Sequence, residues 1–198
     1  MSRKRLENID EAILEKTIEL GGNSEANRSF STKDIAEACA ISEYTVFSRY
    51  KSKDLLLAKA GERVYQALSS EAILLAEGTT TVHDFFNRYL DWLIANPTYT
   101  FFTLNYGHGV PHIAPLADDR TSHREKVITD AANILSKFGI EPVEDYLLLW
   151  SYMLRHLIYF AAYVLNDPRT DTKENRFRNE MIVNCGLNAF VHNLGGEA

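Results

Sequence analysis

The sequence predicts an all-α protein of about nine helices, in which an N-terminal three-helix helix-turn-helix domain precedes a larger helical domain. Apolar residues recur at helical spacing along most of the 198 residues. No stretch alternates apolar and polar residues as a half-buried strand does, and only five prolines and ten glycines interrupt the pattern. Because 45% of the residues are apolar, the chain can bury a large core, which argues against disorder.

Capping and turn residues mark the breaks between these helices. Ser31 and Ser42 stand where N-caps are expected, and Asp34 completes a capping box after Ser31. Glycine and proline mark most of the other breaks. The expected helices span residues 5–20, 31–39, 42–50, 53–77, 82–95, 97–105, 118–138, 141–165 and 172–193, with a loop at 107–115.

Residues 31–53 have the layout of a DNA-reading helix-turn-helix: two short helices, a tight turn between them, and a third helix directly afterwards. The apolar spacing in this stretch is explained by packing alone. The polar side of residues 42–50 is informative, because side chains placed there reach base edges in the major groove; a plain solvent-exposed face explains the same pattern. These side chains are Ser42, Glu43, Tyr44, Thr45, Ser48 and Arg49.

The same stretch resembles the TetR family of bacterial transcriptional regulators. The resemblance is carried by Asp34-Ile35-Ala36, Ile41-Ser42, Thr45-Val46-Phe47 and the run from Tyr50 to Leu56. It is specific over about residues 5–60, whereas the rest agrees only in length, helix count and a long apolar helix pair at the C-terminus. It implies a DNA-binding domain at 1–52 and an effector-binding and dimerisation domain at 53–198.

The resemblance implies a ligand-responsive DNA-binding transcriptional regulator. It is expected to repress transcription from a palindromic operator, from which a small apolar or amphipathic molecule releases it. The alternative is a helix-turn-helix protein that acts through a protein partner or by organising DNA, without an effector. The residues implied to bind DNA are Lys33, Ser42, Glu43, Tyr44, Thr45, Arg49, Tyr50, Lys51 and Lys53.

Four features depart from the family pattern. Ala40 replaces the usual turn glycine, so we expect a turn that avoids a strongly positive φ. Tyr44 replaces a common glycine, which adds bulk and predicts an altered sequence preference. Phe47 replaces a tyrosine and removes a hydroxyl that often meets phosphate. The loop at 21–30 is longer than usual.

The net charge of −6 argues at first against a nucleic-acid partner, but the charge is unevenly distributed. Residues 1–60 carry ten basic and ten acidic side chains, whereas residues 61–198 carry eleven and seventeen. A neutral N-terminal part binds phosphate when its cations share one face. The run Arg3-Lys4-Arg5 fits either an arm toward DNA or a solvated terminus.

The aromatic residues concentrate after residue 60, which fits either a ligand pocket or an ordinary core. Arg155 falls inside an apolar helix, so we expect it to be buried beside an acid such as Asp91, a dimer contact or an anionic ligand. The predicted pocket residues are Phe86, Tyr89, Trp92, Phe102, Tyr106, His112, Trp150, Arg155 and His156.

The last predicted helix carries an apolar stripe that fits a homodimer interface, as the resemblance implies; packing within one chain is the alternative. The stripe consists of Phe177, Met181, Ile182, Cys185 and Ala189.

Several other classes are not favoured. Residues 146–165 are long enough to span a membrane, but Arg155 and His156 lie at their middle and no basic flank orients them. His108 and His112 have a metal-like spacing that glycine and proline break. The sequence shows no nucleophile–base motif, so we expect neither an enzyme nor a cofactor or metal. Two distant cysteines and an N-terminus without a signal peptide predict a cytoplasmic protein.

Overall fold

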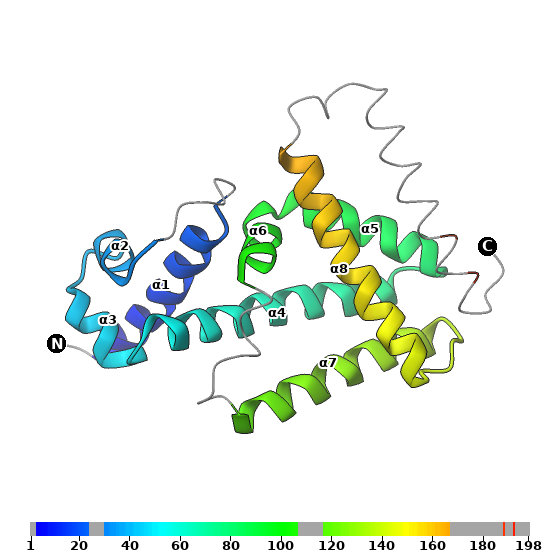
Figure 1. The fold of residues 1–198 in the computed structure, drawn as a ribbon, viewed down its shortest axis with the longest axis horizontal. Coiled ribbons are helices and arrows are strands. Elements are labelled where there is room, and N and C mark those ends of the chain that lie inside the picture. Colours follow the sequence, from blue (N-terminus) through cyan, green and yellow to red (C-terminus); the bar gives the residue numbers. More distant parts are fainter. Residues whose placement is uncertain (1–2, 24–29, 107–116, 167–187, 189–191, 193–198) are drawn as a thin grey trace. The chain divides into compact units, whose positions relative to one another are not determined.

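The computed structural model describes residues 3–23, 30–106 and 117–166, together with Asn188 and His192. Within this part the regular structure is entirely helical, with eight helices (Figure 1). The predicted all-α fold is therefore confirmed, and the expected count of about nine is close. Most of the predicted helix at 172–193 and the loop at 107–115 lie outside the described residues. The helices are α1 (Arg3–Gly21), α2 (Thr32–Ala38), α3 (Glu43–Tyr50), α4 (Lys53–Glu77), α5 (Val82–Ala95), α6 (Pro97–Tyr106), α7 (Ala117–Lys137) and α8 (Glu144–Asn166).

The chain folds into two compact units. The first contains residues 1–67 and 98–117, and the second contains residues 68–97 and 118–198. Helix α4 runs through both units, and nearly all of α6 belongs to the first. The functional boundary expected between residues 52 and 53 stays a prediction.

Local capping sets the starts of α2 and α3, as predicted. The hydroxyl of Ser31 accepts the N–H of Asp34 at 3.2 Å, and the Asp34 carboxylate accepts the N–H of Ser31 at 2.6 Å. The hydroxyl of Ser42 accepts the N–H of Thr45 at 3.2 Å. Each cap satisfies a backbone donor that has no partner within the helix.

The turn between α2 and α3 contradicts the expectation for Ala40. Its φ is +52°, in the left-handed region. The N–H of Ile41 donates to the Ala36 carbonyl at 3.0 Å, and the N–H of Ala40 donates to the Glu37 carbonyl at 3.1 Å. This pair of bonds is the Schellman ending of a helix, which places its C′ residue at positive φ. The expectation was wrong because the hydrogen-bond pattern, and not the side chain, determines the backbone here.

The core of the first unit joins the helix-turn-helix to α1 and the start of α4. Fully buried Ile13, Ile35, Val46 and Leu56 form its centre, together with Phe30 and Ala36. This is the three-helix packing that the apolar spacing predicts, extended by Leu56 from α4.

Helix α6 completes the first unit by packing near the end of α1. The Asn105 amide donates to the Gly21 carbonyl at 3.0 Å, and the Tyr106 ring lies edge-on to Phe30 with centroids 6.0 Å apart. At Gly22 an added β-carbon would lie 2.2 Å from the Thr98 carbonyl oxygen. Only glycine permits this close approach of the two backbones.

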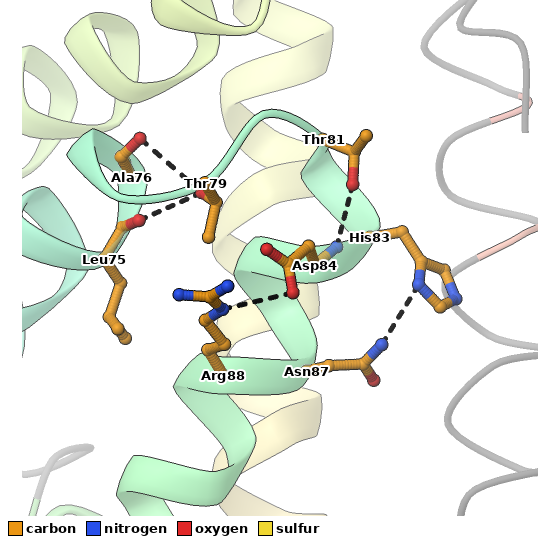
Figure 2. Close-up of polar contacts among 8 residues, drawn as sticks. All are labelled: Leu75, Ala76, Thr79, Thr81, His83, Asp84, Asn87 and Arg88. Atoms are coloured by element: carbon orange, nitrogen blue, oxygen red, sulfur yellow. Dashed lines mark hydrogen bonds and ion pairs between the residues drawn. The ribbon is translucent and has the colours of Figure 1, made fainter.

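In the second unit, a tight turn joins α4 to α5 (Figure 2). The Thr79 hydroxyl donates to the Leu75 carbonyl at 2.9 Å and closes the end of α4. Thr81 caps α5, because its hydroxyl accepts the N–H of Asp84 at 3.1 Å. The Asp84 carboxylate in turn accepts a hydrogen bond from Arg88, one helical turn later, at 3.1 Å. These contacts fix the first turn of the helix that carries most of the unit's aromatic core.

Candidate nucleic-acid interface

Helix α3 presents one side to the core and the opposite side to solvent. Val46 is 1% exposed and packs inward. Tyr44 is 81% exposed and Phe47 is 42% exposed, and these two residues are three positions apart. Residues with this spacing lie on one side of a helix. The second helix of the predicted motif therefore exposes aromatic rings where a DNA-reading helix meets base edges.

Two of the predicted DNA-binding residues support the start of α3. The Ser42 and Thr45 hydroxyl groups lie 2.8 Å apart, and the Ser42 hydroxyl also caps the helix. This arrangement fixes the position of the first turn. It also uses part of the hydrogen-bonding capacity of both side chains.

The two charged side chains within α3 that were predicted to bind DNA both have protein partners. The Glu43 carboxylate accepts a hydrogen bond from the Thr32 hydroxyl at 2.6 Å. The Arg49 guanidinium forms an ion pair with Asp10 of α1, and the Arg49 side chain is 22% exposed. Both side chains thus lie within the motif, but Glu43 is bound to α2 and Arg49 is bound to α1.

Tyr50 lies at the end of α3 and is anchored to α1. Its hydroxyl donates to the Asp10 carbonyl oxygen at 3.3 Å. Burial, reinforced by the nearby Asp10 carboxylate, raises the pKa of the Tyr50 phenol to about 12. The phenol is therefore neutral at physiological pH.

The three predicted lysines differ in their surroundings. Lys33 is 71% exposed and lies 3.8 Å from Glu37 of the same helix. The Lys51 ammonium donates to the Ser48 carbonyl at 3.2 Å. The Lys53 ammonium donates to the Phe30 carbonyl and lies 4.4 Å from the centre of the Phe30 ring. Lys33 and Lys51 are thus exposed cations, whereas Lys53 is half-buried and also supports the core.

Sequence reasoning missed the part that α1 plays in this site. Asp10 is 39 positions from Arg49, so no local spacing links the two residues. Thr32, which holds Glu43, was also not singled out. The apolar spacing also placed Phe47 in the three-helix core, and this was wrong, because the Phe47 ring is 42% exposed.

The predicted pocket residues do not all belong to one unit. Phe86, Tyr89 and Trp150 are buried in the second unit, where the Phe86 and Trp150 ring centroids are 4.9 Å apart. Phe85, which is fully buried, stacks on Trp150 at 5.3 Å. Trp92 is half-buried beside Tyr89, with centroids 6.1 Å apart. This is the ring packing that the core interpretation predicts.

The other predicted pocket residues lie elsewhere. Phe102 and Tyr106 belong to the first unit, where their ring centroids are 5.3 Å apart. His112 lies outside the described residues. Arg155 and His156 are exposed in the single chain, so the expectation that Arg155 is buried is wrong within one chain, whereas its burial at a dimer contact stays a prediction. It failed because α8 is buried on one side only.

The exposed side of α8 carries aromatic residues at helical spacing. Tyr152 is 60% exposed, Tyr159 is 47% exposed and Tyr163 is 49% exposed, and Arg155 lies among them. No described helix is long and apolar enough to cross a membrane. The predicted dimer residues Phe177, Met181, Ile182, Cys185 and Ala189 lie outside the described part of the chain.

The fold is similar to that of a solved regulator. The crystal structure of a TetR family transcription regulator from Marinobacter aquaeolei VT8 matches with a TM-score of 0.65 and 20% sequence identity. The match covers 95% of this chain and 98% of that chain. No family model and no curated protein matches the sequence. At this identity the likeness concerns the fold, which extends well beyond the helix-turn-helix.

Proposed function

We propose that this protein is a DNA-binding transcription regulator of the TetR type that reads duplex DNA with α3. The observation that carries the proposal is the exposed side of α3 within a capped helix-turn-helix, in a chain whose fold matches a TetR family regulator over 95% of its length. Lys33 and Lys51 supply exposed cations near this side. We further propose that the protein is cytoplasmic and acts by binding, not by catalysis.

The proposal is tested by incubating the purified full chain with fragmented genomic DNA of the source organism and sequencing the retained fragments. A dimeric regulator enriches a few sites that contain an inverted repeat. If each subunit neutralises about four phosphates, the slope of log K against log salt is about −7. A slope near zero, or retention of all fragments alike, contradicts the proposal.

A matched pair of lysine variants locates the interface. Lys33→Ala removes an exposed cation of α2 from each subunit and weakens binding to every duplex, with a slope for the dimer that is shallower by about 2. Lys126→Ala removes an exposed, ion-paired lysine of α7 and leaves both quantities unchanged. Equal effects of the two variants would place the DNA elsewhere.

We also propose a homodimer, supported by the aromatic side of α8 and by the predicted apolar stripe of the last helix. A second copy that covers Tyr152, Tyr159 and Tyr163 would remove these rings from water. Light scattering at micromolar protein should give the mass of a dimer, and Tyr159→Glu should shift it toward the monomer. Leu74→Glu, at a 60% exposed position of α4, is the control. A monomeric wild-type protein excludes this assembly.

We further propose that a small apolar or amphipathic effector binds the protein and releases it from an operator that it represses. It is supported by the concentration of aromatic residues in the second unit. The packing of Phe85, Phe86 and Trp150 against one another favours the alternative, in which the unit is solid and the regulator acts through a protein partner. An apolar compound that changes the fluorescence of Trp92 and Trp150 and also weakens DNA binding would support an effector. If the protein enriches specific DNA and no apolar compound changes that binding, the alternative is supported.

A further inference from the structure

The side of α3 that faces solvent is unusual in its chemistry for a helix that reads DNA. Among its exposed side chains are two large aromatic residues, Tyr44, whose ring carries one hydroxyl, and Phe47, whose ring is purely apolar. The helix sequence, EYTVFSRY, contains no asparagine, glutamine or lysine. Its only charged residues are Glu43 and Arg49.

Both charged side chains are directed to protein partners. Arg49 pairs with Asp10, whose backbone carbonyl also accepts the Tyr50 hydroxyl, so two contacts join the end of α3 to α1. Glu43 accepts the Thr32 hydroxyl at 2.6 Å. Moving either group to a base edge would break a contact that the first unit already makes.

Base recognition in the major groove depends on which groups a helix offers. Guanine is read mainly by arginine or lysine, adenine by asparagine or glutamine, and cytosine by carboxylates. Thymine is distinguished by its C5-methyl group, which binds apolar side chains. With Arg49 and Glu43 held against other helices, α3 offers aromatic rings, and its surface matches the methyl group of thymine.

We propose that α3 recognises an A·T-rich half-site by packing Tyr44 and Phe47 against the C5-methyl groups of thymines in the major groove. This inference rests on the proposed function and names the class of operator that the same interface binds. Each methyl group removed from water against a ring contributes about a fourfold gain in affinity. Two half-sites that each use two methyl groups therefore gain on the order of a hundredfold from these contacts.

The test uses duplexes selected from a random pool by the full-length protein. One enriched duplex is resynthesised with deoxyuridine in place of single thymidines, which removes the methyl group and keeps the base pair. We expect each substitution at a contacted position to weaken binding about fourfold. The slope of log K against log salt should stay unchanged, because a methyl contact releases no counterions.

Protein variants connect the methyl groups to the rings. In Tyr44→Ala or Phe47→Ala, the difference between thymidine and deoxyuridine should disappear at the positions that the missing ring contacts. Both side chains are exposed, so we expect the variants to fold, and circular dichroism checks this. Leu74→Ala removes an exposed apolar side chain of α4 and should retain the full difference.

Two results separate this inference from the proposed function. Specific duplexes whose affinity is unaffected by deoxyuridine but falls tenfold or more with 7-deazaguanine would show that the interface reads guanine N7 through a hydrogen-bond donor and not thymine through its methyl group. That result overturns the inference and leaves the regulator intact. Failure to enrich any duplex overturns both.

Discussion

The turn that ends α2 predicts that replacing Ala40 by glycine stabilises the protein. A second turn provides the matched comparison. After α7, the N–H of Ile140 donates to the Leu135 carbonyl at 3.0 Å, and Gly139 has a φ of +72°. Ala40 and Gly139 thus occupy the same position of the same hydrogen-bond pattern, one as alanine and the other as glycine.

The magnitude follows from two opposing effects. The left-handed conformation costs a residue with a β-carbon about 1–2 kcal/mol. Glycine avoids this cost but gives the unfolded chain more freedom, which costs about 0.4–1 kcal/mol. We therefore expect Ala40→Gly to raise the free energy of unfolding by about 0.5–1 kcal/mol. Gly139→Ala should lower it by a similar amount, because no atom lies within 4 Å of the added β-carbon and only the backbone is strained.

Thermal unfolding of the full chain measures both changes. The two tryptophans, Trp92 and Trp150, belong to the second unit, so their fluorescence reports that unit, whereas far-UV circular dichroism reports all helices. Ala40→Gly should raise the midpoint seen by circular dichroism by roughly 2–6 °C for a unit of this size. Gly139→Ala should lower the midpoint seen by fluorescence. A lower midpoint for Ala40→Gly would refute the reasoning from φ.

Three further predictions concern the first unit. The hydrogen bond from Arg63 holds the pKa of the Glu11 carboxyl below its usual value of 4.5, so stability is lost as the pH falls through that lowered pKa. In Glu11→Gln, the free energy of unfolding from urea denaturation should therefore decrease less steeply at acidic pH. Burial raises the pKa of Tyr50 from 10.0 to about 12, so stability is lost as the pH rises from about 10 through 12, and Tyr50→Phe should remove that loss in alkaline denaturation. Gly22→Ala should lower the free energy of unfolding by about 1–3 kcal/mol in urea, because its β-carbon would meet the Thr98 carbonyl oxygen.

A specific result would contradict each of these predictions. Gly78→Ala is the control for Gly22→Ala, because its β-carbon would meet nothing closer than 3.8 Å, and equal losses in the two variants would exclude the steric argument. An acid limb that is identical in wild type and Glu11→Gln would show that the carboxylate gains nothing on folding. Alkaline unfolding of Tyr50→Phe that matches wild type would assign that transition to other groups.

Helix positions were predictable because their signals are local. Ser31, Asp34 and Ser42 lie within a few residues of the backbone groups that they cap, so the sequence alone indicated where α2 and α3 begin. The long helix α8 was expected from residue 141 but begins at Glu144. The element types and the apolar core of the helix-turn-helix thus follow from patterns that span one or two turns.

The features that could not be predicted depend on contacts between distant residues. The apolar run around Arg155 indicated burial, but burial depends on which side of α8 has a partner. Arg49 appeared free to bind DNA because its partner Asp10 lies 39 positions away in the sequence. Phe102 and Tyr106 were grouped with Phe86 by their aromatic character, although they pack in a different unit.

The packing of α6 bears on where the boundary of the proposed DNA-binding domain lies. Residues 1–52 contain the motif and all of the predicted base-contacting side chains, but they omit Leu56, which is fully buried in the same core. They also omit Asn105 and Tyr106, whose contacts hold the end of α1 and Phe30. A helix of about ten residues gains little from its own hydrogen bonds, so the tertiary contacts of α2 and α3 provide most of their stability. The geometry of α3, the proposed DNA-reading helix, therefore depends on segments of the chain well beyond the motif that identifies it.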